Sequence, residues 1–141
     1  EDFAIGDTLD LLIEKRVPVF GVCLGLQGIV EYFGGALGVL DVPMHGKPSV
    51  VRARSARLLK DLPEHFTVGR YHSLFAEPSS FPAVLSATAE TDDGIIMAIE
   101  HKTLPIAAVQ FHPESVMTSP GEVGMPILEA ALSVLCETAE A

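Results

Sequence analysis

The sequence contains little cysteine, no tryptophan and few basic residues. Its two cysteines are Cys23 and Cys136, and 9 basic residues stand against 19 acidic ones, for a net charge of −10. Two cysteines do not form a disulfide framework, and the absence of a CxxC or Cys/His cluster argues against a zinc site. This cysteine usage favours a reducing, cytoplasmic location, and Cys136 is expected to be inert.

The charge and the hydropathy pattern exclude two classes of partner. A strongly acidic chain is a poor ligand for nucleic acid or an anionic membrane. No apolar run approaches the ~20 residues of a membrane span. The weak basic cluster Arg52, Arg54, Arg57 and Lys60 alternates with apolar residues, so we interpret it as the solvated face of a strand. Glu1 is not an initiator methionine and begins no signal peptide, so we expect a piece cut from a longer protein.

Apolar periodicity predicts an α/β domain. Helical spacing favours helices over residues 6–16, 24–33 and 125–136. Residues 17–22 have the short, β-branched pattern of a fully buried parallel strand. The Asp-Asp-Gly sequence at 92–94 predicts a hairpin, and Gly34-Gly35 a helix end. The last helix is expected to cover the sheet with Leu128, Ala131, Leu132 and Leu135, and further strands are expected over residues 49–54, 66–71, 83–89, 95–100 and 106–111.

The pentapeptide at residues 21–25, Gly-Val-Cys-Leu-Gly, lies between the apolar strand and a helix. This is the cysteine form of a nucleophile elbow, in which the central residue adopts a cramped backbone conformation. Gly21 and Gly25 would let the strand and helix approach closely. The helix N-terminus would favour the thiolate and lower the pKa of Cys23 to roughly 3.5–7.5. The alternative is that Cys23 is a small buried hydrophobic residue.

A second chemical motif follows the strand predicted at residues 106–111. His112 and Glu114 are separated by Pro113, which favours extended backbone at His112, so the two side chains point to the same side. A nucleophilic cysteine needs a base of this kind, held in one tautomer by a carboxylate. The alternative is a capped strand end with an exposed His-Glu pair. Both motifs would lie at the carboxyl ends of strands, where α/β sheets build their sites.

The other four histidines are better explained by surface or packing positions than as catalytic bases. His72 follows a predicted strand, a position compatible with a place near the site. His45 lies in a polar turn and is compatible with a partner-facing role. His65 and His101 stand beside charged residues and are expected to be solvated.

Three motifs together resemble a known family. Residues 21–27 (GVCLGLQ), 71–74 (YHSL) and 110–115 (QFHPES) are similar to those of the class I, triad-type glutamine amidotransferases. The resemblance implies a flavodoxin-like α/β fold, a mixed sheet flanked by helices, with N-terminal strands missing. It implies hydrolysis of glutamine through a cysteine thioester and transfer of ammonia to a synthase. The implied roles are nucleophile for Cys23, base and then acid for His112, orienting carboxylate for Glu114, oxyanion donor for the Leu24 N–H, and glutamine contacts for Gln27, Ser73 and Leu74.

Within the family, residues 31–35, 39–47 and 121–124 resemble the anthranilate synthase branch, the last of them its fused bacterial forms. The implied substrate is L-glutamine, and the implied partner is a chorismate-using synthase, fused N-terminally or present as a separate subunit. No cofactor is implied for this domain, because Mg²⁺ would belong to the partner synthase.

One departure from the family concerns its Gly-Pro-Gly loop, which supplies a second oxyanion donor. No such loop precedes Cys23. We therefore expect residues 1–141 to be the C-terminal two-thirds of a single amidotransferase domain. Loss of one oxyanion donor costs roughly 10²–10³ in rate, so the isolated piece is expected to be weakly active or inactive.

Three alternative functions remain open at this point. The same domain serves aminodeoxychorismate or phenazine-type synthases, and only the partner discriminates these. A γ-glutamyl hydrolase or peptidase shares the Cys-His chemistry but releases its product to water. A non-catalytic interaction module is the last class, for which Cys23 would react no faster than Cys136.

Overall fold

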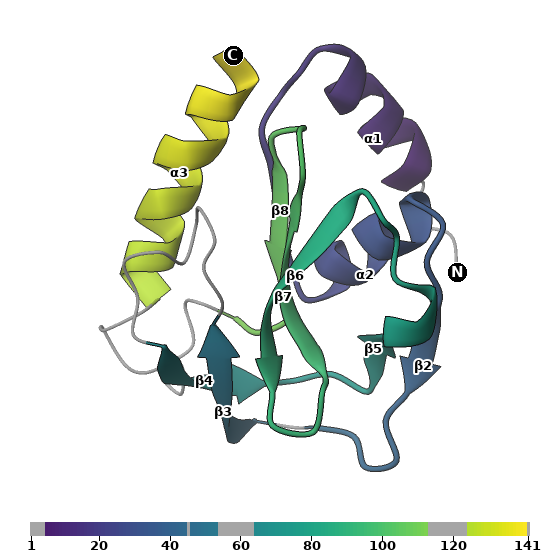
Figure 1. Ribbon diagram of the computed structural model, residues 1–141, viewed down its shortest axis with the longest axis vertical. Coiled ribbons are helices and arrows are strands. Elements are labelled where there is room, and N and C mark those ends of the chain that lie inside the picture. Colours follow the sequence, from purple (N-terminus) through teal and green to yellow (C-terminus); the bar gives the residue numbers. More distant parts are fainter. Residues whose placement is uncertain (1–4, 45, 54–63, 113–123, 141) are drawn as a thin grey trace.

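The computed structural model describes residues 5–44, 46–53, 64–112 and 124–140, and a mixed six-stranded sheet lies at its centre (Figure 1). The strand order is β1 (Val19–Val22), β8 (Ile106–Val109), β7 (Ile96–His101), β6 (Leu85–Thr91), β3 (Lys47–Ala53) and β4 (His65–Arg70). β1 and β8 are parallel, and the other neighbours are antiparallel. The short strands β2 (Leu37–Val39) and β5 (Leu74–Ala76) form a separate antiparallel pair.

Helices cover both faces of the large sheet. Figure 1 shows α3 (Gly124–Glu140) on one side, and α1 (Ile5–Glu14) and α2 (Leu24–Tyr32) on the other. A single 3₁₀ turn, η1 (Pro78–Ser80), precedes β6. The side chains of β8 alternate between the layers: Ile106 and Ala108 pack in the cluster containing α1 and α2 residues, whereas Ala107 and Val109 join the α3 cluster. The predicted mixed sheet flanked by helices is confirmed.

One expectation about burial is wrong, and a second is wrong in part. β1 is parallel as predicted, but of its four residues only Gly21 is fully buried. The reason is that β1 is an edge strand in the described part of the sheet. It pairs with β8 on one side, and its other side is left more exposed. In α3, Ala131 and Leu135 are buried against the sheet as predicted, together with Ile127, whereas Leu132 is 72% exposed. The buried stripe follows i, i+4, i+8 spacing and passes beside Leu132.

Both predicted chain reversals are confirmed. The β6–β7 hairpin turns through Asp92–Gly94, where Gly94 has a φ of 88°. Helix α2 ends at Tyr32, and Gly34 follows with a φ of 99°, a left-handed conformation that glycine adopts without a Cβ clash. Across the described part of the chain, no helix is long and apolar enough to cross a bilayer.

The basic cluster is described only in part. Arg52, on β3, is exposed, and its guanidinium lies 3.8 Å from the Glu90 carboxylate of β6. The solvated strand face is therefore confirmed at this residue. Arg54, Arg57 and Lys60 lie outside the described residues.

The turn from β1 into α2 brings the backbones of Gly21 and Gly25 close together. A Cβ built on Gly21 would lie 2.9 Å from the carbonyl carbon of Gly25 and 3.2 Å from its Cα and oxygen. These are backbone atoms, so they cannot yield by rotating a side chain. A Cβ on Gly25 meets no atom within 4 Å in the described structure. Gly21 therefore fulfils the expected role of permitting close approach, but Gly25 does not.

We expect Gly21→Ala to destabilise the protein by about 1–3 kcal/mol, because the elbow backbone must move to admit the methyl group. Gly25→Ala is the matched control, and we expect it to be neutral or to stabilise by up to about 1 kcal/mol, since alanine is the better helix former. Chemical denaturation of the full protein measures both. Equal destabilisation by the two substitutions would contradict the elbow packing described above.

A second pair of variants tests the orientation of α3. Ile127→Ala removes a fully buried side chain and is expected to cost about 2–5 kcal/mol, whereas the exposed Leu132→Ala should change stability by less than about 0.5 kcal/mol. Denaturant midpoints at equal m-values measure the difference. A larger effect at Leu132 would favour the helix face predicted from the sequence.

Candidate active site

The site is built at the carboxyl ends of β1 and β8. Cys23 follows β1 directly, and its backbone N–H donates to the Val109 carbonyl at the end of β8, at 2.8 Å. Its φ of 58° and ψ of −101° are unusual for a residue with a side chain. Such a conformation costs about 1–3 kcal/mol and persists where the surroundings fix it. The cramped elbow expected from the sequence is confirmed.

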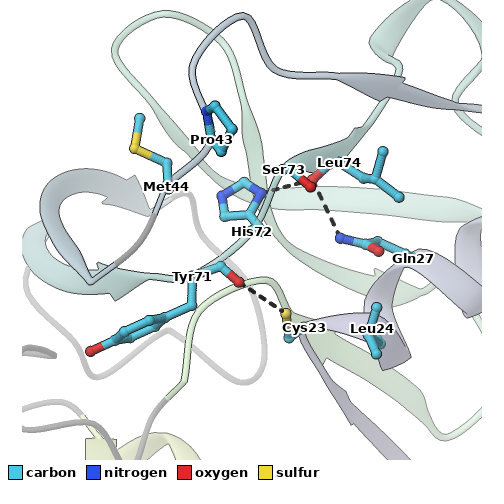
Figure 2. A pocket seen from close by; sticks show the side chains of 9 residues that line it. All are labelled: Cys23, Leu24, Gln27, Pro43, Met44, Tyr71, His72, Ser73 and Leu74. Atoms are coloured by element: carbon cyan, nitrogen blue, oxygen red, sulfur yellow. Dashed lines mark hydrogen bonds between the residues drawn. The ribbon is translucent and has the colours of Figure 1, made fainter.

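A pocket of about 430 Å³ opens beside the elbow, within the range of small-molecule sites (Figure 2). Three chain segments that are far apart in the sequence meet there: the start of α2, the loop after β2, and the connection between β4 and β5. Five of the residues singled out from the sequence line it, namely Cys23, Leu24, Gln27, Ser73 and Leu74. The other four lining residues are Pro43, Met44, Tyr71 and His72.

The backbone of residues 70–74, here called the wall segment, forms one side of the pocket. The loop after β2 holds it in place, because the N–H groups of Gly46, Met44 and Leu40 donate to the carbonyls of Arg70, His72 and Ser73 at 2.8–2.9 Å. The carbonyls of Tyr71 and Leu74 accept bonds from the side chains of Cys23 and Gln27, as Figure 2 shows. The wall is therefore fixed by pairing on both sides, and its two end residues, Arg70 and Leu74, belong to β4 and β5.

Gln27 lies one turn into α2 and is buried. Its Nε2 donates to the Leu74 carbonyl at 3.3 Å and to Oε1 of Gln110 at 3.2 Å. The side chain therefore ties the helix to the wall segment and to the end of β8. Its predicted glutamine contact remains a prediction.

The Cys23 sulfur takes part in two hydrogen bonds. The thiol donates to the Tyr71 carbonyl at 3.8 Å, and Nε2 of Gln110 donates to the sulfur at 3.6 Å. Burial raises the pKa of the Cys23 thiol, and hydrogen bonds from the Leu24 N–H and the Gln110 amide oppose this increase without cancelling it. The expectation of a lowered pKa is therefore wrong for this structure. The reason is that desolvation of the sulfur raises the pKa by more than the Leu24 N–H and the Gln110 amide lower it.

His112 is half-buried just beyond β8, and its ring packs edge-on against Tyr71, with centroids 5.6 Å apart. The Tyr71 carbonyl is the same group that accepts the Cys23 thiol. The structure therefore brings His112 to the residue that borders the nucleophile. Glu114 lies outside the described residues, so the orienting role expected of it stays a prediction.

His72 lies at the pocket, as its position after β4 allowed. Its Nε2 accepts from Nε of Arg70 at 3.0 Å, so the ring proton is on Nδ1, which lies 2.7 Å from the Leu74 carbonyl. Burial lowers the pKa of His72, and the neighbouring Arg70 adds to this, while the bond to Leu74 opposes it. A neutral His72 thus holds the wall segment, consistent with the predicted packing role.

The remaining histidines and Cys136 are placed outside this pocket or the described residues. His101 is buried at the end of β7, and its Nδ1 accepts from the backbone N–H groups of Thr103 and Leu104. The prediction of a solvated His101 is wrong, because the ring caps a turn in the core. His65 is exposed as predicted, and His45 is outside the described residues. Cys136 is exposed on α3.

Gln110 has no role among the predictions made from the sequence, although it belongs to one of the three motifs. It is fully buried and contacts both Gln27 and Cys23. A signal was present, because a polar residue directly after a buried apolar strand stands at the carboxyl end of that strand, where α/β sheets build their sites. Among the described residues, no group of three or more His, Cys, Asp or Glu side chains is arranged to hold a metal ion.

Comparison with known proteins agrees with this arrangement. The family model described as "Glutamine amidotransferase class-I" matches residues 6–126. An anthranilate synthase of Azospirillum brasilense is 55% identical over 127 residues, covering 90% of this chain and 17% of that protein. An anthranilate synthase component 2 of the same organism is 47% identical over 125 residues, covering 89% of this chain and 62% of that protein.

A solved structure shows the same fold. The crystal structure of a Thermoplasma acidophilum protein, assigned as part of a GMP synthase, superposes with a TM-score of 0.83 at 26% identity. The superposition covers 97% of this chain and 65% of the other. The chain thus spans less than two-thirds of the length of each of these relatives. The family model matches most of the chain, and the chain belongs to the class-I glutamine amidotransferase family.

Proposed function

We propose that this chain is the glutamine-hydrolysing part of an anthranilate synthase, supplying ammonia to a chorismate-using synthase. The observation that carries the proposal is the pocket, which a strained elbow cysteine lines together with Gln27, Ser73 and Leu74. These residues come from motifs about 50 positions apart in the sequence. A nucleophile, a fixed backbone wall and a cavity of about 430 Å³ suit a small amino-acid amide.

The proposed chemistry begins with the thiol of Cys23. His112 takes the thiol proton, and the sulfur attacks the side-chain amide carbon of glutamine. The carbonyl oxygen then carries negative charge, which the Leu24 N–H stabilises. His112 returns the proton to the amide nitrogen, and ammonia leaves as the γ-glutamyl thioester forms. Water, deprotonated by His112, attacks the thioester and releases glutamate and the thiol, while Glu114 keeps the imidazole oriented.

The wall segment provides the proposed contact for the amino-acid end of glutamine. Its Arg70, His72 and Ser73 carbonyls are already paired with the loop after β2. This pairing fixes the pocket-lining Ser73 and Leu74 before substrate arrives, and a preformed wall lowers the entropy lost on binding. Gln27 sets the distance between this wall and the elbow through its bond to the Leu74 carbonyl.

The proposed partner follows from the relatives. One relative named anthranilate synthase contains this region as 17% of its length, whereas the relative named component 2 contains it as 62%. This supports a synthase partner in the same polypeptide or in a separate subunit. L-Glutamine is the proposed substrate, and the proposed domain itself carries no cofactor, because Mg²⁺ would serve the synthase.

We further propose that residues 1–141 correspond to the C-terminal two-thirds of one amidotransferase domain. Coverage of 62% of the component 2 relative and of 65% of the Thermoplasma acidophilum protein supports this fraction. The rest of the domain would supply the second oxyanion donor. Experiments on activity therefore use the full protein that contains this sequence.

Replacing the nucleophile separates the two nitrogen sources. We expect Cys23→Ala in the full protein to abolish synthesis of anthranilate from chorismate and glutamine but to leave synthesis from added ammonium intact. Cys136→Ala is the matched control and should retain both activities, because that exposed residue lies on α3. Equal loss with both nitrogen donors would mean that Cys23 is structural. Formation of aminodeoxychorismate instead of anthranilate would assign a different synthase.

The proposed base and its orienting carboxylate should differ in effect. His112→Ala removes the base and is expected to lower glutamine-dependent kcat by about 10²–10⁴. Glu114→Ala leaves the base present but misoriented, so we expect a smaller loss. Steady-state assays at saturating glutamine, with ammonium-dependent synthesis as the reference, measure both. A larger loss at Glu114 would contradict the assigned roles.

A further inference from the structure

A continuous line of polar groups connects a buried arginine to the nucleophile. Nε of Arg70 donates to His72, and His72 donates to the Leu74 carbonyl. Nε2 of Gln27 donates to that same carbonyl and also to Oε1 of Gln110. Nε2 of Gln110 then donates to the Cys23 sulfur at 3.6 Å. Arg70, Gln27 and Gln110 are each 4% exposed or less, so this line runs through the interior.

A backbone group determines the direction of the Gln27 amide, and the Gln27 amide in turn determines that of Gln110. The Leu74 carbonyl can only accept hydrogen bonds, so the end of Gln27 that faces it must be the NH₂ group. The same NH₂ group faces Gln110, so Gln110 must present its oxygen to Gln27. The other end of the Gln110 amide, its NH₂, therefore faces the sulfur. A flipped Gln110 would place two donors against each other at Gln27 and an acceptor against the sulfur.

We propose that Gln110 is a thiolate-stabilising residue, whose amide N–H is aimed at the Cys23 sulfur by the chain of bonds through Gln27 and Leu74. A hydrogen bond from a neutral donor to an ionised acceptor is about twice as strong as one to a neutral acceptor. The bond at 3.6 Å therefore strengthens when the thiol loses its proton. The bond from the thiol to the Tyr71 carbonyl is lost at the same moment, because it needs the proton.

The role of Gln110 in the reaction rests on the proposed glutaminase chemistry. When His112 takes the proton, the sulfur carries a negative charge that Gln110 stabilises until the carbon–sulfur bond forms. When water attacks the thioester, the carbon–sulfur bond breaks and the electron pair returns to the sulfur. Gln110 then stabilises the leaving thiolate until His112 reprotonates it. The Gln110 amide stays intact and gives up no proton in either step.

Gln110 is suited to a test because it does not titrate. The titratable side chains described around the sulfur are Tyr71 and His72 on the wall segment, His112 against Tyr71, and Arg70 behind His72. All of them remain when Gln110 is replaced by methionine, an apolar side chain of similar size. A change in thiol reactivity would then report the lost donor.

The experiment measures iodoacetamide labelling of Cys23 as a function of pH in the full protein, by mass spectrometry of the peptide that contains it. We expect Gln110→Met to move the labelling midpoint to higher pH and to slow labelling at neutral pH by about tenfold. Labelling of exposed Cys136 should not change, which gives an internal reference. Thr88→Val, which removes a buried hydroxyl on β6, two strands from β8, is the control for general loss of a buried polar group. An unshifted midpoint in folded Gln110→Met would overturn the proposal.

A second measurement needs no variant of Gln110. The side-chain amide proton of Gln110 should shift in NMR spectra over the same pH range in which Cys23 becomes reactive, and this shift should disappear in Cys23→Ser. A Gln110 signal that ignores the ionisation of Cys23 would also overturn the proposal. Neither measurement requires turnover. A protein that shows both shifts but lacks glutaminase activity would refute the proposed function and leave Gln110 as a thiolate-stabilising residue.

Discussion

The parallel pairing of β1 with β8 is the constraint on which the site depends. It aligns Val22 with Val109, so both strands end at the same level of the sheet. The bond from the Cys23 N–H to the Val109 carbonyl extends this pairing into the elbow. Residues that are more than 80 positions apart in the sequence, Cys23 and Gln110, are thereby brought into contact. A slip of one residue in this register would turn the side chains that follow β8 to the other face.

Burial and hydrogen bonding act in opposite directions on the nucleophile. Burial raises the pKa of the Cys23 thiol, whereas donors from Leu24 and Gln110 lower it. The same interior position keeps His72 neutral, with its pKa lowered by burial and by Arg70. In a low-dielectric interior each remaining hydrogen bond has a larger effect than it would in water. The site therefore depends on a few directed contacts rather than on a field of charged groups.

The pocket wall shows how irregular backbone is made rigid. The wall segment, residues 70–74, joins β4 of the large sheet to β5 of the small one. Its carbonyls are paired in turn with Gly46, Met44 and Leu40, and with the side chains of Cys23 and Gln27. Residues 71–73 lie between the two strands, and held in this way they can present a fixed surface to a ligand. The two-stranded pair β2–β5 anchors one end of the wall, because Leu74 pairs with Val39.

The sequence by itself determined the elements whose pattern is local. The elbow at Cys23, the hairpin at Asp92–Gly94 and the end of α2 at Gly34 each depend on the backbone preferences of neighbouring residues, and all three are present. The three-residue strands β2 and β5 were not predicted, because so short a segment has no period to detect. Only the tertiary structure decided that Leu132 is exposed, that His101 is buried and that Gln110 reaches the sulfur. Burial and long-range hydrogen bonds depend on which segments meet in space, and the order of residues along the chain does not contain those distances.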